Sequence, residues 1–135
     1  MTYFFIKWYN RAMEKGIVEK LNDCRSLIES ALEYGDQTHT FDDIVEGVLK
    51  GEYQFWEAPL GCAITEIVVF PRKKVLHIFL YAGELQQVLD MEESAKIWAK
   101  EFGCSAFSLS GRRGWKRVLE KRGFRELYTT LAKDI

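Results

Sequence analysis

Glu66 is the acid whose position in the sequence most suggests proton chemistry. It lies in a β-branched, apolar run, Thr65-Glu66-Ile67-Val68. A carboxyl group held among apolar side chains is a candidate proton acceptor, because perturbed titratable groups gather at functional sites. If the run alternates as a half-buried strand, Glu66 simply faces solvent instead. The sequence leaves both interpretations open.

The spacing of the histidines and cysteines gives little indication of a metal site, a disulfide framework or a catalytic base. His77 sits among apolar residues, where a lone histidine is more often a hydrogen-bonded core residue than a base. The second histidine, His39, is too far away in sequence for a convincing zinc pair. The three cysteines are odd in number and widely spaced, which fits neither a disulfide framework nor a CxxC metal pattern. We expect no metal and three reduced, buried thiols, at Cys24, Cys62 and Cys104.

A dense basic cluster marks the segment 112–122. It opens beside two glycines, and only Glu120 interrupts it with negative charge. Such a cluster could bind a phosphate-bearing ligand, contact nucleic acid or an acidic protein, or form the solvated face of an amphipathic helix. Its members are Arg112, Arg113, Lys116, Arg117, Lys121 and Arg122.

Composition predicts one globular domain over residues 1–135. Hydrophobic residues make up 47% of the chain and charged ones 29%, which is wrong for a disordered protein. A net charge of −1 gives no ground for binding nucleic acid or an anionic membrane. The apolar start, residues 1–6, is too short for a signal-peptide core or a membrane span. We expect a cytoplasmic protein.

Hydrophobic periodicity divides the chain into a helical first third, residues 1–51, and a mixed remainder, residues 52–135. Helical spacing covers about 10–34, with Gly16 as a break, and a second helix opens at its N-cap Thr40 and ends at Gly51. The period then changes to two. We expect strands at 53–57, 62–70, 75–81, 105–109 and 126–132, helices at about 84–102 and 113–122, and a turn at 71–74.

This order predicts a mixed α/β sheet. The first three strands are joined by short connections and should be antiparallel. The step from strand 75–81 through a helix to strand 105–109 should join parallel neighbours. The fold class is therefore an antiparallel meander followed by a β-α-β-α-β unit, with helices on both faces.

A family resemblance appears at this point. The passage 117–126, Arg-Val-Leu-Glu-Lys-Arg-Gly-Phe-Arg-Glu, resembles the late helix-to-strand segment of the GNAT acyl-CoA N-acyltransferase superfamily. The similarity covers roughly residues 52–135 and includes the order of the elements. The stretch 109–115, Leu-Ser-Gly-Arg-Arg-Gly-Trp, also looks like small GNAT-like proteins of tailed bacteriophages.

The resemblance implies a site. In the family, acyl-CoA sits where two central parallel strands separate, its pantetheine against the first strand and its pyrophosphate at the following helix N-terminus. It also implies acetyl-CoA as cofactor, Glu66 as the base for an amine, and Tyr128 or Tyr81 as a substitute proton donor. The positions that would hold the cofactor are Leu80, Tyr81, Ala82, Gly83, Glu84 and Leu85.

The chain departs from the family pattern in two places. The phosphate cradle has one glycine, Gly83, followed by Glu84, whose carboxylate would stand beside a phosphate. Those two residues could instead turn a strand into a helix and complement its dipole. The family's late-helix tyrosine corresponds to Leu119, which cannot move a proton.

Three functions remain open. The first is an N-acyltransferase acting on an unknown amine. The second is a catalytically inactive GNAT-fold binding or assembly protein, encoded by a phage and found in host cytoplasm or virion, with a protein partner or a second copy on an aromatic surface. That surface would use residues 3–9 with Tyr53, Phe55 and Trp56. Nucleic-acid binding through the basic segment is the weakest of the three.

Overall fold

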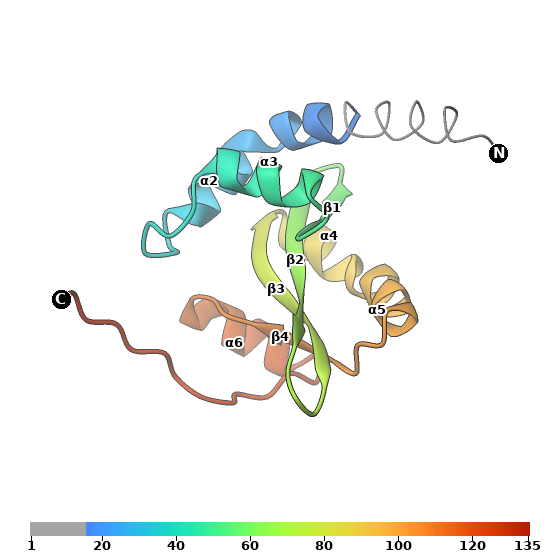
Figure 1. Ribbon diagram of the computed structural model, residues 1–135, viewed down its shortest axis with the longest axis vertical. Coiled ribbons are helices and arrows are strands. Elements are labelled where there is room, and N and C mark those ends of the chain that lie inside the picture. The colour runs from blue at the N-terminus through green and yellow to red at the C-terminus, as the bar shows by residue number, and fades with distance from the viewer. Residues whose placement is uncertain (1–15) are drawn as a thin grey trace.

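A computed structural model of the chain describes residues 16–135. Residues 16–23 are helical, and the elements that follow run along the chain in the order drawn in Figure 1. They are α2 (Arg25–Leu32), α3 (Phe41–Leu49), β1 (Gln54–Ala58), β2 (Gly61–Val69), β3 (Lys74–Gly83), α4 (Leu85–Asp90), α5 (Glu92–Glu101), β4 (Ala106–Leu109) and α6 (Arg113–Glu120).

The four strands form one mixed sheet in the order β1-β2-β3-β4. β1 pairs with β2, and β2 with β3, in antiparallel fashion. β3 pairs with β4 in parallel, with Val75 opposite Ala106 and Ile78 opposite Leu109. The predicted fold class, a meander followed by a parallel crossover, is confirmed.

Helices cover both faces of the sheet, as predicted (Figure 1). On one face α2 and α3 pack on the strands around a buried cluster that includes Leu21, Ile28 and Ile44. On the other face α4 contacts β2 and β3, and α5 buries Ala95 and Ala99 against Leu76. The sheet is therefore covered by apolar side chains on both faces at its centre, which explains why the sequence of β3 is almost continuously apolar.

β3 carries a bulge near its middle. Ile64 of β2 pairs with Leu80, but the next residue, Thr65, pairs with Ile78, so Phe79 has no partner. Phe79 and Leu80 consequently both pack on the cluster under α2 and α3. A bulge of this kind bends a strand and re-aims the side chains beside it.

Two helix boundaries follow from local chemistry. At α3, the Thr40 hydroxyl accepts a hydrogen bond from Asp43 N–H, and the Asp43 carboxylate accepts one from Thr40 N–H, so the predicted cap is confirmed as a reciprocal box. The predicted single helix after Gly83 is instead two helices that meet at Met91. Glu92 and Glu93 open the second one, where negative charge meets the positive end of the helix dipole.

The predicted last strand is wrong. Residues 126–132 have no regular structure, and none of their backbone groups pairs with a described strand, the open edge of β4 included. After α6 the chain turns at Gly123, whose φ is +94°. Phe124 then stacks against Phe107 of β4 at 6.2 Å between ring centroids. Beyond it the tail leaves the sheet (Figure 1).

Two sequence expectations bear on surfaces. Within residues 16–135 no helix is long and apolar enough to cross a membrane. The proposed aromatic surface at residues 3–9 lies outside the described residues. Its other members, Tyr53, Phe55 and Trp56, are half-buried, and Tyr53 and Phe55 pack against the core.

Candidate functional site

The two parallel strands separate partway along their length. Their ladder ends at the pair Ile78 and Leu109, while β3 continues through residues 79–83. β4 stops at that point, and the chain passes through Gly111 into α6. The β4-facing backbone of residues 79–83 is therefore left without a strand partner among the described residues. An extended ligand could pair with this stretch of β3 as an added strand does.

A row of three polar side chains crosses the sheet next to this point of separation. Glu66 on β2 lies opposite His77 on β3, and His77 lies beside Ser108 on β4. His77 Nδ1 and Ser108 Oγ are 2.8 Å apart and share a hydrogen bond. All three residues are half-buried. His77 is two residues before Phe79, so the row faces the same side of the sheet as α2 and α3.

His77 carries a neutral imidazole. Burial lowers its pKa below the usual value, and the nearby Glu66 carboxylate opposes that shift to a smaller extent. The imidazole is therefore neutral at pH 7. Nδ1 is engaged with Ser108, and no residue in 16–135 hydrogen-bonds Nε2. Nε2 is thus the ring nitrogen that has no hydrogen-bond partner among the described residues.

The two tyrosines proposed as proton donors are placed very differently. Tyr128 lies in the tail, 77% exposed, and the structure does not bring it to the polar row. Tyr81 lies on β3 beside the separation, where its ring meets Trp115 of α6 at 5.1 Å. Burial raises the pKa of Tyr81 to about 12, which makes its hydroxyl a weaker acid than a thiol. The buried Leu119 supplies no donor in their place.

The predicted phosphate cradle is built for contacts within the chain. Gly83 has φ +106°, and a Cβ there would lie 2.3 Å from Leu60 O. Glu84 N–H donates to the same Leu60 carbonyl, and the Gln87 amide oxygen accepts a hydrogen bond from Leu60 N–H. The Glu84 carboxylate accepts a hydrogen bond from Gln87 N–H at 2.9 Å and so caps α4. A carboxylate therefore occupies the helix end where a phosphate would bind.

The other predicted cofactor positions divide between core and surface. Leu80 and Ala82 are buried in the cluster under α2 and α3, so they could meet a ligand only through their backbone. Leu85, at the start of α4, is 43% exposed. The six positions are contiguous at the open part of β3, but their side chains do not line one common surface.

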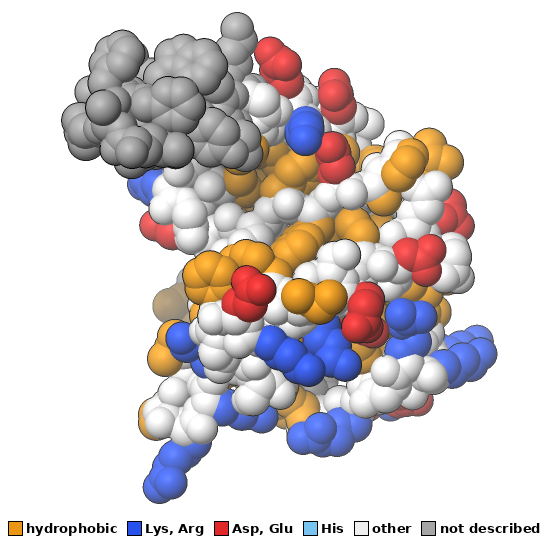
Figure 2. Space-filling model, turned by 90° about the vertical axis from the view of Figure 1, so that its right-hand side faces the viewer, with side chains coloured by type: hydrophobic (Ala, Val, Ile, Leu, Met, Phe, Trp, Pro, Cys, Tyr) orange, Lys and Arg blue, Asp and Glu red, His pale blue; other side chains and the backbone are white. Residues whose placement is uncertain are grey.

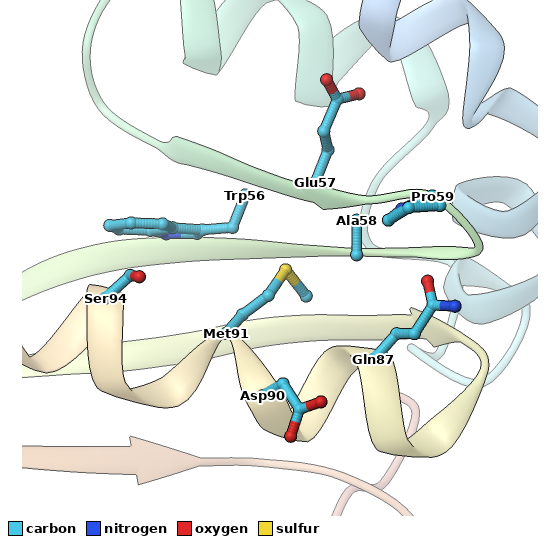
Figure 3. Close-up of a pocket in the computed structure, with 8 residues that line it drawn as sticks. All are labelled: Trp56, Glu57, Ala58, Pro59, Gln87, Asp90, Met91 and Ser94. Atoms are coloured by element: carbon cyan, nitrogen blue, oxygen red, sulfur yellow. The ribbon is translucent and has the colours of Figure 1, made fainter.

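A separate cleft lies elsewhere on the molecule. It has a volume of about 460 Å³ and lies at the β1 edge of the sheet, opposite the β4 edge, beside α4 and α5. Met91 points into it and Glu57 points away (Figure 3). Glu57 pairs with Lys20 and Asp90 with Gln86, so the acids at this cleft are already engaged. Its lining residues are Trp56, Glu57, Ala58, Pro59, Gln87, Asp90, Met91 and Ser94.

The basic segment around α6 is partly neutralised within the chain. Arg112 lies over the ring of Tyr34 at 3.8 Å. Lys116 forms ion pairs with Glu120 and Glu126. Arg122 donates to Leu89 O, and its guanidinium lies 3.5 Å from the Glu92 carboxylate. The remaining three cations of the cluster, Arg113, Arg117 and Lys121, are exposed.

Charge is also unevenly spread on the face that carries α4 and α5. Lys and Arg side chains gather in its lower half, and acidic side chains lie mostly above them (Figure 2). Both signs of charge are present on this face, so it is not a single basic surface.

The cysteine expectation is confirmed and the metal expectation stays a prediction. Cys24, Cys62 and Cys104 are all buried and free. Burial raises the pKa of Cys62 to about 12, so it is an inert thiol. Over residues 16–135 no three histidine, cysteine or acidic side chains come together as metal ligands would.

The mixed four-stranded sheet with helices on both faces matches the fold of GNAT acetyltransferases, and solved structures agree. One is a probable acetyltransferase, with a TM-score of 0.63 and 17% identity over 87% of this chain and 95% of that one. Another is a ribosomal-protein-alanine N-acetyltransferase from Brucella melitensis, with a TM-score of 0.62 and 11% identity over 87% and 94%.

A third is an aminoglycoside acetyltransferase from an uncultured soil metagenomic sample, solved with sisomicin, with a TM-score of 0.62 and 8% identity over 87% and 91% of the two chains. No protein-family model and no curated protein matches the sequence. The chain thus has the fold of GNAT acetyltransferases.

Sequence reasoning missed the partnership of His77 with Ser108. The two residues are separated by 31 positions, and only the register of β3 against β4 brings them together. The parallel crossover was predicted, and writing out its register from the first residue of each expected strand would have placed Ser108 near His77. Glu66 was named as a base, and the structure puts it next to the histidine.

Proposed function

We propose that the protein is an acyltransferase that accepts an acyl group from acyl-CoA and passes it to an amine. The observation that carries this proposal is the open backbone of β3 at residues 79–83, directly beside the row of Glu66, His77 and Ser108. Acyl-CoA would supply a thioester, an acyl group ready for transfer. The β3 backbone would hold the pantetheine arm, and the polar row lies where the ladder ends.

His77 is the residue we assign to the amine's proton. An amine attacks a thioester only as the free base, so a neutral imidazole must take a proton as the new amide bond forms. Glu66 would then stabilise the imidazolium, and the Ser108 hydroxyl would fix the orientation of the ring. Tyr128 remains only a predicted proton donor for the departing thiolate, because the structure leaves it in the exposed tail, away from the polar row.

A second function is favoured by one specific observation. The Glu84 carboxylate caps α4 at the place where the family binds a pyrophosphate. An inactive GNAT-fold binding or assembly protein binds no pyrophosphate, so a negative charge at Glu84 would cost it nothing. The two functions therefore differ in whether CoA binds at all.

Calorimetry with acetyl-CoA tests the proposal. We expect heat of binding and a raised Tm, because a ligand of the native state stabilises it. Glu84→Gln keeps a cap acceptor but removes the charge, so it should tighten CoA binding about fivefold or more while leaving pantetheine binding unchanged. Glu101→Gln, at the far end of α5, is the matched control. If millimolar acetyl-CoA binds neither the natural chain nor Glu84→Gln, acyl transfer from acetyl-CoA is excluded. The inactive GNAT-fold binding or assembly protein is then the supported function.

Turnover tests the role of His77. Two structural neighbours are named for acting on an aminoglycoside and on a ribosomal protein's alanine, so an aminoglycoside, a peptide N-terminus and a polyamine are suitable trial amines. His77→Asn should lower kcat about 100-fold or more with acetyl-CoA affinity unchanged. Ser108→Ala should have a smaller effect. Equal turnover in the His77 variant and the natural chain would remove the histidine from the mechanism.

A further inference from the structure

The Ser108 hydroxyl lies next to the end of the β3–β4 ladder. The last pair of the ladder is Ile78 with Leu109, and Ser108 is the neighbouring residue on β4. The serine is half-buried, and its Oγ lies 2.8 Å from Nδ1 of His77. A serine hydroxyl within hydrogen-bond reach of a neutral imidazole is the arrangement that activates a serine as a nucleophile.

The hydrogen bond between Ser108 and His77 can run in either direction, because a neutral imidazole has two tautomers. When Nδ1 carries the proton, it donates to Oγ, and Nε2 is the free base that the proposed amine transfer uses. When Nε2 carries the proton, the Ser108 hydroxyl donates to Nδ1, and Nδ1 can take that proton as Oγ attacks. Glu66 lies on the other side of His77, on β2, where its carboxylate stabilises the imidazolium that forms. One histidine can therefore act as the base for two nucleophiles.

Backbone donors lie beside the same point of the sheet. β3 continues through residues 79–83 past the end of the ladder, so the β4-facing N–H groups of this stretch have no strand partner among the described residues. A carbonyl attacked by a serine becomes an oxyanion, and N–H groups already held in place stabilise that charge. The open end of β3 therefore offers such donors next to Ser108.

We propose that Ser108 accepts acyl groups from activated esters and thioesters, with His77 as its base, so that the chain hydrolyses them through an acyl-serine. In the first step Oγ bonds to the carbonyl carbon, the bond to the alcohol or thiol breaks, and the serine proton passes through Nδ1 to the leaving group. In the second step water attacks the acyl-serine and gives a proton to Nδ1, and Oγ leaves with that proton as the carboxylic acid forms. This hydrolysis goes beyond the proposed amine transfer and requires neither CoA nor an amine.

The ester p-nitrophenyl acetate tests this hydrolysis, because it carries an activated acyl group and no CoA. We expect the natural chain to release p-nitrophenolate with a burst of about one equivalent per chain, as the acyl-serine accumulates. Peptide mass mapping after an acid quench should place the acetyl group on Ser108. Ser108→Ala and His77→Asn should each lower the Ser108-dependent turnover about 100-fold or more. Ser110→Ala is the matched control and should keep full activity, because Ser110 is exposed and lies just beyond the end of β4.

Ser108→Cys keeps the proposal testable if the alanine variant fails to fold. A thiol at this position is still a nucleophile beside His77, so the burst should remain, with the acetyl group at position 108 as a thioester. A folded Ser108→Cys chain without a burst would overturn the proposal. Equal ester turnover in the natural chain and in folded Ser108→Ala, or an acetyl group found only on lysines or on His77, would overturn it too.

The ester also separates this inference from the proposed acyl-CoA reaction. A chain that moves acetyl groups from acetyl-CoA to an amine, but shows no Ser108-dependent hydrolysis of the ester, overturns the acyl-serine alone. A chain that hydrolyses the ester through Ser108, but does not bind millimolar acetyl-CoA, supports the acyl-serine and overturns the acyl-CoA proposal alone.

Discussion

At the scale of single residues, Gly83 and Glu84 have distinct structural tasks at the start of α4. Gly83 lets β3 pass directly against the β1–β2 turn, where Leu60 O leaves no room for a side chain. Glu84 then supplies the helix cap. The same two residues stand where a phosphate-binding loop is expected, so a sequence pattern alone cannot separate the two uses. What separates them is whether the helix N–H groups already have a partner.

Gly83→Ala should be severely destabilising. The substitution adds the cost of a positive φ to a clash of the new Cβ with a backbone oxygen, and we expect a loss of about 3 kcal/mol or more in the free energy of unfolding. Gly51→Ala is the control, because Gly51 also has a positive φ, +76°, but open space around its Cα. That variant should lose about 1 kcal/mol. Urea denaturation measures both, and equal losses would show that the contact with Leu60 has no cost.

The burial of His77 predicts a pH dependence of stability. Its pKa is lowered in the folded chain, so between that pKa and the unfolded value, about 6.5, the unfolded chain binds more protons. Stability should therefore fall as pH drops below about 6.5. His77→Gln removes this contribution, and its unfolding free energy should decline less between pH 7.5 and 5.5. Parallel profiles for the natural chain and the variant would contradict a lowered pKa at His77.

At the scale of elements, most of the fold could be predicted from local sequence patterns. Caps, glycines and periodicity placed the helix after Thr40, the three meander strands and β4 within one to three residues. The failures were non-local. Nothing in residues 126–132 indicates whether a neighbouring strand is available, and a one-residue bulge at Phe79 is set by the pairing of β3 with β2. The polar row depends on the same registers, so only Glu66 was proposed from sequence.

The capping box of α3 gives a test at this scale. Thr40→Ala removes the hydroxyl that accepts Asp43 N–H, and we expect a loss of about 1 kcal/mol in the free energy of unfolding. Thr40→Ser keeps the hydroxyl and should lie within a few tenths of a kcal/mol of the natural chain. Thermal and urea unfolding report both changes. A serine variant as weak as the alanine variant would assign the effect to the lost methyl group instead of the cap.

At the scale of the whole molecule, the packed body ends at Phe124, and residues 125–135 form an exposed tail. The sheet and its two helical layers bury an apolar cluster on each face, and α6 is joined to this body through Trp115 on Tyr81 and Arg122 on Leu89 O. Phe124 is the last residue that packs on this body, and its N–H bonds to Leu119 O to close the helix. The boundary between body and tail therefore falls within two residues.

Two truncations should reveal that boundary. A chain ending after Arg125 loses only exposed side chains and one exposed ion pair, so at concentrations where it is monomeric its free energy of unfolding should change by less than about 0.5 kcal/mol. A chain ending after Gly123 also loses the half-buried Phe124 ring and its bond to α6, and should lose about 1 kcal/mol or more. Urea denaturation of both chains at the same low concentration makes the comparison. If the chain ending after Arg125 already loses as much as the chain ending after Gly123, the tail packs on the body and the boundary at Phe124 is wrong.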